Sequence, residues 1–408
     1  MTTLAVIVFV LTYVGMALGR VPGLAIDRTG VALLGLIVLL AAGDLTLAEA
    51  GAAVDMPTIT LLFALMILSA QFERSGFYGW VADRIVHAAR SPRLLLVVLV
   101  AVTGGLSAIF TNDVVVFALT PLVASGLISQ RLDPRPYLIG LAGAANAGSA
   151  ATLIGNPQNI LIGQAGGLDF WTYFVFALPP TIVSLAFVYV AVSATWRLQA
   201  AIELTPLSTP SVEIDRFQMA KGLVAVALLV ALFLTPLPRE LSALAVAGLL
   251  LMSRRLSSRD MIGAVDWHLL LLFVCLFGVT AAVAKTGLAQ DGLVWLADQG
   301  LLPDRLSVLA PLTLVASNTI GNVPSVILLL KLIPDLSDGV LTALALLSTF
   351  AGNLLLTGSL CNIIVAERAA GTGVTLGFVD FARSGIPMTL ASMAATVAWL
   401  WATGMVVF

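Results

Sequence analysis

Polar residues in the middle of a long apolar run are the first feature of this sequence that could do chemistry. Thr111-Asn112-Asp113 lies between the apolar runs 94–110 and 114–127. Inside a lipid bilayer, ionisable side chains persist only where protein buries them or a cavity hydrates them. Asp113 could therefore carry a proton or bind a cation, and Asn112 could coordinate an ion. The alternative is structural, since both side chains could simply cap the helix that follows.

The second half of the chain repeats this arrangement. Ser317-Asn318-Thr319 runs on to Gly321-Asn322 and again interrupts an apolar run. In each half a longer apolar run follows that is broken by small and polar residues, at 145–159 and at 352–362. These four segments supply the candidate substrate- and ion-binding residues. The candidates are Thr111, Asn112, Asp113, Asn146, Ser149, Thr152, Gly155, Asn156, Asn159, Ser317, Asn318, Thr319, Gly321, Asn322, Asn353, Thr357, Gly358, Ser359 and Asn362.

The composition is that of a membrane protein. Of the 408 residues, 60% are hydrophobic and 10% are charged, whereas soluble domains contain about 25% charged residues. The apolar runs are long enough to cross a bilayer. The formal net charge of -2 argues against nucleic acid as a partner. Cys275 and Cys361 lie in apolar runs and predict neither a disulfide nor a metal site.

Several functions are disfavoured by the motifs that the sequence lacks. It has no phosphate-binding glycine loop, no zinc-protease motif and no Ser/His/Asp set, so we expect neither ATP hydrolysis nor any other enzymatic activity. The run from Thr3 to Leu18 follows no basic segment and precedes no clear cleavage site. We therefore expect it to be a retained helix.

The order of landmarks indicates an internal duplication. Val54-Asp55-Met56 opens an apolar run in the first half, and Val265-Asp266-Trp267 opens one in the second. We predict an all-α polytopic membrane protein with two inverted-topology repeats, each with five transmembrane helices and one re-entrant hairpin, and with broken helices at the midplane. The predicted boundaries are 1–196 for the first repeat (hairpin 94–128, broken helix 137–163), 197–221 for a cytoplasmic linker and 222–408 for the second repeat (hairpin 305–335, broken helix 340–366).

The distribution of Lys and Arg predicts the orientation. If each hairpin leaves the membrane on the side that it entered, each half crosses five times and the halves point in opposite directions. With both termini outside, Arg239, Lys285, Arg305 and Lys331 are the outside members of the 20 Lys and Arg residues. A full crossing at Asn112 would weaken this bias. The same topology places His268 and Glu367 at membrane surfaces.

Inverted repeats with interrupted helices are typical of secondary transporters, which bind their substrate at the midplane. An interruption leaves unpaired N–H groups at one helix end and unpaired carbonyls at the other. The N–H end attracts anions, whereas carbonyls and Asn or Ser oxygens bind a cation such as Na+. We expect one central site, with Na+ as a coupling ion near Asn112 and Asn322 and with no other cofactor.

The same motifs resemble those of a known group of proteins. Phe110-Thr111-Asn112-Asp113-Val114 resembles the Asn-Asp hairpin of the arsenite permease and related anion permeases. Ser149–Asn159 and Gly358–Asn362 resemble the paired motifs of divalent anion/sodium symporters. The resemblance to this ion transporter superfamily, which includes sodium–proton antiporters, covers nearly the whole chain. It implies a scaffold, a moving transport domain, H+ or Na+ coupling and a homodimer.

One departure from the superfamily bears on the substrate. Dicarboxylate carriers have Ser-Asn-Thr at both tips, whereas here Thr111-Asn112-Asp113 stands at the first. The carboxylate of Asp113 favours proton coupling, or a neutral or monoanionic substrate.

The leading hypothesis is a secondary active permease that moves a small anion or oxyanion across the bacterial inner membrane by an elevator-type motion. An arsenite or antimonite efflux permease is the first alternative. A Na+/H+ antiporter ranks lower because such proteins usually carry more membrane carboxylates, and an uncoupled anion channel could use the same hairpins. The expected partners are the anionic substrate, the lipid bilayer and a second copy of the chain.

Overall fold

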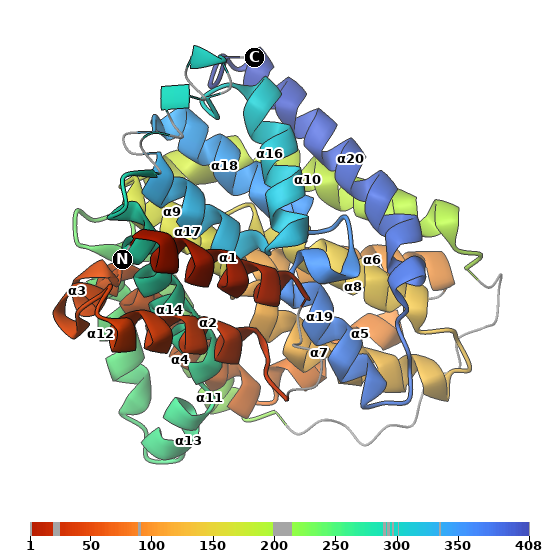
Figure 1. Ribbon diagram of the computed structural model, residues 1–408. Coiled ribbons are helices and arrows are strands. Elements are labelled where there is room, and N and C mark those ends of the chain that lie inside the picture. Colours follow the sequence, from red (N-terminus) through yellow and green to blue (C-terminus); the bar gives the residue numbers. More distant parts are fainter. Residues whose placement is uncertain are drawn as a thin grey trace.

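The computed structural model describes residues 2–18, 25–88, 91–198, 214–288, 291, 294–295, 298–300, 302–333 and 336–407. Within these ranges every regular element is a helix (Figure 1). In chain order they are α1 (Thr2–Leu18), α2 (Arg28–Ala42), α3 (Leu47–Ala53), α4 (Met56–Arg74), α5 (Phe77–Ala88), α6 (Pro92–Ile109), α7 (Asn112–Ser129), α8 (Arg135–Ser149), α9 (Pro157–Ala165), α10 (Phe170–Thr195), α11 (Arg216–Leu232), α12 (Arg239–Leu251), α13 (Ser258–Gly263), α14 (Trp267–Ala284), α16 (Leu306–Thr319), α17 (Asn322–Leu332), α18 (Asp338–Ala351), the 3-10 turn η1 (Leu356–Gly358), α19 (Leu360–Ala370) and α20 (Phe378–Ala402).

Several helices are long and apolar enough to cross a membrane. Six such helices occur in the described ranges, namely α4, α6, α7, α10, α14 and α20. Shorter apolar helices accompany them, namely α1, α2, α16, α17 and α18. The chain is therefore a multi-pass membrane protein, as its composition predicts.

Acidic caps fix the starts of two corresponding helices. Asp55 Oδ1 accepts a hydrogen bond from Thr58 N at the start of α4, and Asp266 Oδ1 accepts one from Leu269 N at the start of α14, both at 3.0 Å. A side-chain oxygen at this position satisfies an N–H group that the helix itself leaves free. The two Val-Asp landmarks of the sequence therefore mark two helix starts.

The helices are interrupted where the sequence places small and polar residues. In the first half α8 ends at Ser149 and α9 begins at Pro157; in the second half α18 ends at Ala351 and α19 begins at Leu360. These interruptions lie within the segments 137–163 and 340–366 in which broken helices are predicted.

The two polar tips are short turns between helices. α6 ends at Ile109 and α7 begins at Asn112, whereas α16 ends at Thr319 and α17 begins at Asn322. In the second turn Gly321 has a φ of +97°, a conformation that favours glycine.

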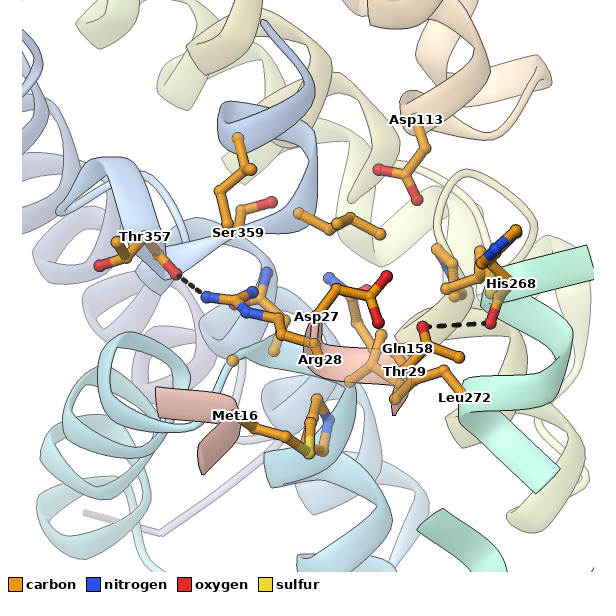
Figure 2. A pocket seen from close by; sticks show the side chains of 18 of the residues that line it. Met16, Asp27, Arg28, Thr29, Asp113, Gln158, His268, Leu272, Thr357 and Ser359 are labelled. Atoms are coloured by element: carbon orange, nitrogen blue, oxygen red, sulfur yellow. Dashed lines mark hydrogen bonds between the residues drawn. The ribbon is translucent and has the colours of Figure 1, made fainter. Parts of the chain in front are cut away.

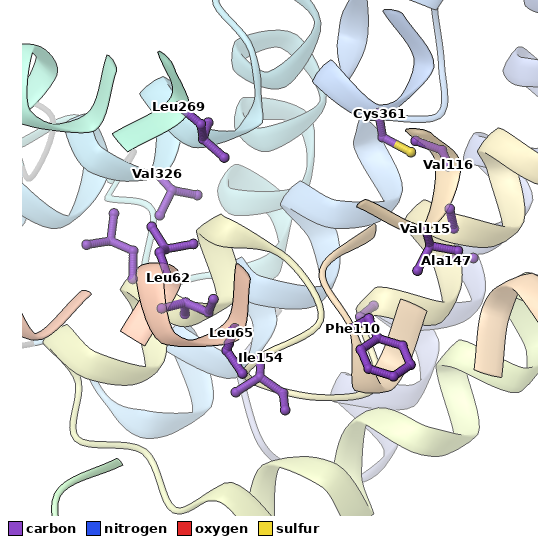
Figure 3. Close-up of a cluster of buried hydrophobic side chains, with 14 of the residues drawn as sticks. Leu62, Leu65, Phe110, Val115, Val116, Ala147, Ile154, Leu269, Val326 and Cys361 are labelled. Carbon is purple, nitrogen blue, oxygen red and sulfur yellow. The ribbon is translucent and has the colours of Figure 1, made fainter. Parts of the chain in front are cut away.

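Phe110 anchors the first turn in a buried aromatic cluster. Its ring centroid lies 4.7 Å from that of Phe72 in α4 and 6.2 Å from that of Tyr78 in α5. Figure 3 shows Phe110 among the apolar side chains that surround this part of the core. The apolar residue beside the polar tip therefore holds the tip against α4 and α5.

Glycine lets α6 and α8 approach each other closely. A Cβ atom at Gly148 would clash with the backbone of Gly104, including its carbonyl oxygen. Small residues permit this kind of close packing between membrane helices. Since α8 carries one side of the first interruption, this contact helps to position the site.

We expect Gly148→Ala to lower the thermal stability of the protein, by about 1–3 kcal/mol as is typical of overpacking. The reason is that the clashing atoms are backbone atoms of Gly104, which cannot rotate away. Gly105→Ala is the matched control, because a Cβ there meets no atom within 4 Å. Thermal unfolding of the purified protein in detergent measures both. Equal melting temperatures for the two variants would contradict the close contact.

The structure describes only the two ends of the segment predicted as a linker. The linker predicted at 197–221 lies mostly outside the described residues, because 199–213 are not among them. Its end is helical, since α11 begins at Arg216 rather than at 222. Asp215 Oδ1 causes this early start by accepting hydrogen bonds from Phe217 N (3.0 Å) and Gln218 N (3.1 Å).

Candidate functional site

A cavity of about 570 Å³ lies where helix ends from both halves of the chain meet (Figure 2). Its wall is formed by parts of α1, α2, α7, α9, α14, α17, η1 and α19. The polar lining residues are Asp27, Arg28, Thr29, Asn112, Asp113, Gln158, Asp266, His268, Asn322, Thr357, Ser359 and Glu367.

The cavity has a buried floor and an exposed mouth. At the floor, Asn112, Asp113 and Asn322 are 3%, 8% and 6% exposed. Asp27 and Asp266 are exposed and lie at the mouth. A small solute can therefore reach the polar tips from one side.

Among the described residues, six helices begin at this cavity, namely α2, α7, α9, α14, α17 and α19. Each start carries unpaired N–H groups and a partial positive charge. Side chains of Asp27, Asn156 and Asp266 cap α2, α9 and α14. The starts of α7, α17 and α19 have no side-chain cap, and Asp113 occupies the first turn of α7. The N-termini of α17 and α19 are therefore the two that are best placed to bind an anion.

Asn146 is the centre of a buried polar network behind the cavity. Its Nδ2 donates to Asn353 Oδ1 (2.8 Å) and to Asn362 Oδ1 (2.9 Å). Its Oδ1 accepts from Asn112 Nδ2 and from Ser359 Oγ, both at 3.0 Å. All four hydrogen-bonding positions of the amide are thus used. One side chain joins α8 to the first tip and to the second interruption.

A corresponding network surrounds Thr349 in α18. Thr349 Oγ1 accepts from Asn156 Nδ2 and donates to Asn159 Oδ1, both at 3.2 Å. Asn146, Asn156 and Asn159 each have a counterpart 203 residues later in the second half, namely Thr349, Ser359 and Asn362. Asn146 in the first half bonds to Ser359 and Asn362 in the second interruption. Thr349, its counterpart in the second half, bonds to Asn156 and Asn159 in the first interruption.

Hydrogen bonds within the two interruptions also join residues whose numbers differ by 203 between the halves. Asn159 Nδ2 donates to Thr152 O, and Asn362 Nδ2 donates to Leu355 O, both at 3.1 Å. These amides satisfy carbonyls that the interrupted helices leave free. The two interruptions are built alike at the level of individual hydrogen bonds.

The two polar tips differ in how fully their side chains are paired. Asn112 N donates to Gly155 O at 2.9 Å, and Asn112 Oδ1 accepts from Asp113 N at 3.0 Å. In the second half, the buried Oδ1 atoms of Asn318 and Asn322 accept no hydrogen bond from the described residues. Orphaned amide oxygens are suited to a hard cation such as Na+. Within the described part of the chain, the second tip therefore leaves two buried amide oxygens unpaired, whereas the amide oxygen of Asn112 at the first tip is paired.

The carboxylate of Asp113 faces the cavity (Figure 2). Within the described ranges the carboxylate makes no hydrogen bond or ion pair, whereas the backbone N–H of Asp113 donates to Asn112 Oδ1. The start of α7 favours a negative charge there, whereas burial opposes one. Because one effect favours the charged carboxylate and the other favours the neutral carboxyl, Asp113 is suited to binding and releasing a proton.

The predicted site residues fall into three groups. Those that line the cavity are Asn112, Asp113, Gly321, Asn322, Thr357 and Ser359. Those in the polar network behind it are Asn146, Ser149, Asn156, Asn159, Asn353 and Asn362. Those that surround the tips and interruptions without lining the cavity are Thr111, Thr152, Gly155, Ser317, Asn318, Thr319 and Gly358. Of this last group, Thr319 is exposed and its hydroxyl donates to Val315 O in its own helix.

The sequence did not predict the polar residues at the mouth as site residues. His268 and Glu367 line the cavity, although they are expected at membrane surfaces. Asp266 also lines the cavity. The sequence marks this residue as a helix start, because its position matches that of Asp55 in the first half. No comparable pattern marks Asp27 or Arg28. Their place in the cavity depends on how α2 packs.

A metal site of the usual protein type is not found in the part of the chain that the structure describes. There, no group of three or more His, Cys, Asp or Glu side chains is arranged to hold a metal ion. Cys275 and Cys361 are buried free thiols.

Comparison with known proteins identifies the family. The model of the citrate transporter family, CitMHS, matches residues 7–340, which include both polar tips and the first interruption. This chain belongs to the CitMHS family. Membership confirms the resemblance to anion permeases that the tips and interruptions indicate.

Relatives of this CitMHS chain are named as transporters. An uncharacterized transporter of Mycobacterium tuberculosis, Rv2684, is 28% identical over 424 residues, covering 98% of each chain. The silicon efflux transporter LSI3 of Oryza sativa subsp. japonica is 27% identical over 450 residues, covering 92% of each. The crystal structure of the Alcanivorax borkumensis YdaH transporter matches with a TM-score of 0.55 and 17% identity, covering 98% of this chain and 97% of that one. The last comparison shows a shared fold.

Proposed function

We propose that this chain is a secondary active transporter that moves a small anion or oxyanion across the bacterial inner membrane, coupled to H+ or Na+. The observation that carries the proposal is the cavity in which the uncapped starts of α17 and α19 lie with Asp113. Helix N-termini attract the anion, and the buried carboxylate can hold a coupled proton. The family description makes citrate the first substrate to test.

Two inverted repeats are part of the proposal. The crosswise hydrogen bonds of Asn146 and Thr349, with their constant offset of 203 residues, support two halves of the same local design. The Lys and Arg distribution supports opposite orientations for these halves. Segments with Asp27, Arg28 and Glu367 then face the cytoplasm, and the cavity opens to that side.

The packing of the helices supports an elevator-type motion. α14 packs most extensively against α2, and also against α1, α3 and the tip helix α17, whereas α8 packs against α6, α7, α10 and α19. The cavity lies between α1, α2 and α14 on one side and the helices with the tips and interruptions on the other. Movement of the second group along the first would carry a bound substrate across the membrane. If Na+ is the coupling ion, the Oδ1 atoms of Asn318 and Asn322 would hold it.

A gradient assay tests this proposal. Purified protein in proteoliposomes is given citrate, sulfate, silicic acid or arsenite under an imposed pH gradient, an imposed Na+ gradient or neither. We expect accumulation of at least one anion above equilibrium with one gradient and not with the other. Protein-free liposomes are the control. A lack of gradient-driven flux for the whole panel would refute the proposal, and flux that follows the anion's own electrochemical gradient would identify a channel.

Efflux of a hydroxylated metalloid, such as arsenite or antimonite, is a second candidate. The described cavity wall contains four carboxylates, Asp27, Asp113, Asp266 and Glu367, with one arginine. Such a wall repels a multiply charged anion more than a neutral hydroxylated acid. LSI3, a relative, is named a silicon efflux transporter. Growth of an arsenite-sensitive host with and without the gene tests this candidate.

A further inference from the structure

Arg28 stands out among the residues of the cavity. In the described wall it is the one side chain with a permanent positive charge (Figure 2). Its Nη2 donates a long hydrogen bond of 3.5 Å to the neutral carbonyl of Thr357. A guanidinium group has five N–H donors. Most of the hydrogen-bonding capacity of Arg28 is therefore not used by the described residues.

The nearby carboxylates do not pair with Arg28. No described carboxylate lies within 4.0 Å of its guanidinium nitrogens. Asp27 Oδ1 instead accepts from Gly30 N at 2.8 Å, and Asp266 Oδ1 accepts from Leu269 N. Two of the carboxylates in the cavity are thus engaged as helix caps. A third, that of Glu367, acts on Arg28 through its charge but lies beyond ion-pair distance, so the charge of Arg28 is not neutralised by direct contact.

A second anion-attracting group lies beside Arg28. Thr357, its hydrogen-bond partner, belongs to η1, which ends just before α19 begins. Ser359 holds the N-cap position of α19 but does not cap it, because its Oγ donates to Asn146 Oδ1 instead. The N–H groups at the start of α19 therefore remain available close to Arg28, which bonds to Thr357 just before this helix start.

We infer that Arg28 and the start of α19 together bind the oxyanion group of the transported substrate, and that Arg28 determines the preference for charged substrates. This inference rests on the transport function proposed above. The planar fork of a guanidinium matches two oxygens of a carboxylate or inorganic oxyanion. Arg28 comes from α2 and the N–H groups from α19, so the oxyanion contacts both walls of the open cavity and must leave Arg28 before the wall with α19 moves.

Uptake kinetics of Arg28→Gln and Arg28→Lys in proteoliposomes test the inference, with citrate as the charged probe and silicic acid as the neutral one. Loss of a charge-assisted hydrogen bond costs about 1.5–3 kcal/mol. We therefore expect Arg28→Gln to raise the KM for citrate roughly 10- to 100-fold, with little change for silicic acid. Arg28→Lys retains the charge but not the fork, so its KM for citrate should lie between those of wild type and Arg28→Gln.

Arg383→Gln is the matched control. Arg383 also donates one hydrogen bond of 3.5 Å to a neutral carbonyl, that of Thr195, but it does not line the cavity. A KM for citrate in Arg28→Gln equal to that in Arg383→Gln would overturn the inference and leave the transport function intact. A lower rate and lower melting temperature with unchanged KM would also overturn it, because they indicate a structural role. Wild-type protein that transports no member of the full panel used above would remove the proposed function, and this inference with it.

Discussion

Asn146→Ala is expected to lower the stability of the protein and to abolish transport. The substitution removes four hydrogen bonds, to Asn112, Asn353, Ser359 and Asn362, and leaves unpaired the buried atoms that made them. Hydrogen bonds in membrane proteins contribute about 0.6–1.7 kcal/mol each. Four of them give a loss of about 2–7 kcal/mol. Because the network joins the first tip to both interruptions, the site should lose its shape as well.

Thermal unfolding followed with a thiol-reactive dye measures this effect. Cys275 and Cys361 are buried in the folded protein and become reactive when it unfolds. Ser348→Ala is the control, since Ser348 is equally buried but its hydroxyl bonds weakly, at 3.4 Å, to Ala345 O in its own helix. We expect the control to melt close to wild type. An Asn146→Ala variant that melts with the control and still transports would show that the network does not hold the site together.

Asn146→Asp distinguishes hydrogen bonding from simple packing. Aspartate has the shape of asparagine but lacks the two donors that reach Asn353 Oδ1 and Asn362 Oδ1. The amides of Asn353 and Asn362 cannot flip to present a donor instead, because their Nδ2 atoms already donate to Gly143 O and Gly352 O and a flip would break these bonds. We therefore expect Asn146→Asp to be destabilised as strongly as Asn146→Ala.

The positions of the tips and interruptions could be predicted from the sequence for a local reason. Polar and small residues are rare in apolar membrane segments, so Thr111-Asn112-Asp113 and Ser149–Asn159 are conspicuous in the one-dimensional pattern. The helix starts at Asp55 and Asp266 are also local, since each cap bonds to an N–H three residues along.

The partners of these residues could not be predicted in the same way. Asn146 bonds to Asn353 and Asn362, which are more than 200 residues away, and this pairing depends on how the two halves dock. Ser359 is a favourable N-cap residue, yet its hydroxyl bonds to Asn146 instead. Arg28 follows a helix cap in a pattern that equally fits a membrane surface, and only tertiary packing reveals that it lines the cavity.

Asp113→Asn is expected to retain substrate exchange and to lose pH-driven accumulation. Asparagine preserves the size of the side chain but stays neutral at every pH, so it resembles the protonated carboxyl. The loaded transporter can then still move, but it no longer carries a proton with the substrate. A gradient of one pH unit stores about 1.4 kcal/mol. For one coupled proton, the wild type should thus accumulate substrate about tenfold, whereas the variant should only equilibrate it.

Asp338→Asn is the control for this experiment, because Asp338 also lies in the first turn of a helix, α18, but is exposed and does not line the cavity. Counterflow and pH-driven uptake are measured in the same proteoliposome preparation, so that a misfolded variant loses both and a coupling variant loses one. Wild-type accumulation by Asp113→Asn would remove Asp113 from the coupling step. The orphaned oxygens of Asn318 and Asn322 would then be the groups to test next, under a Na+ gradient in place of a pH gradient.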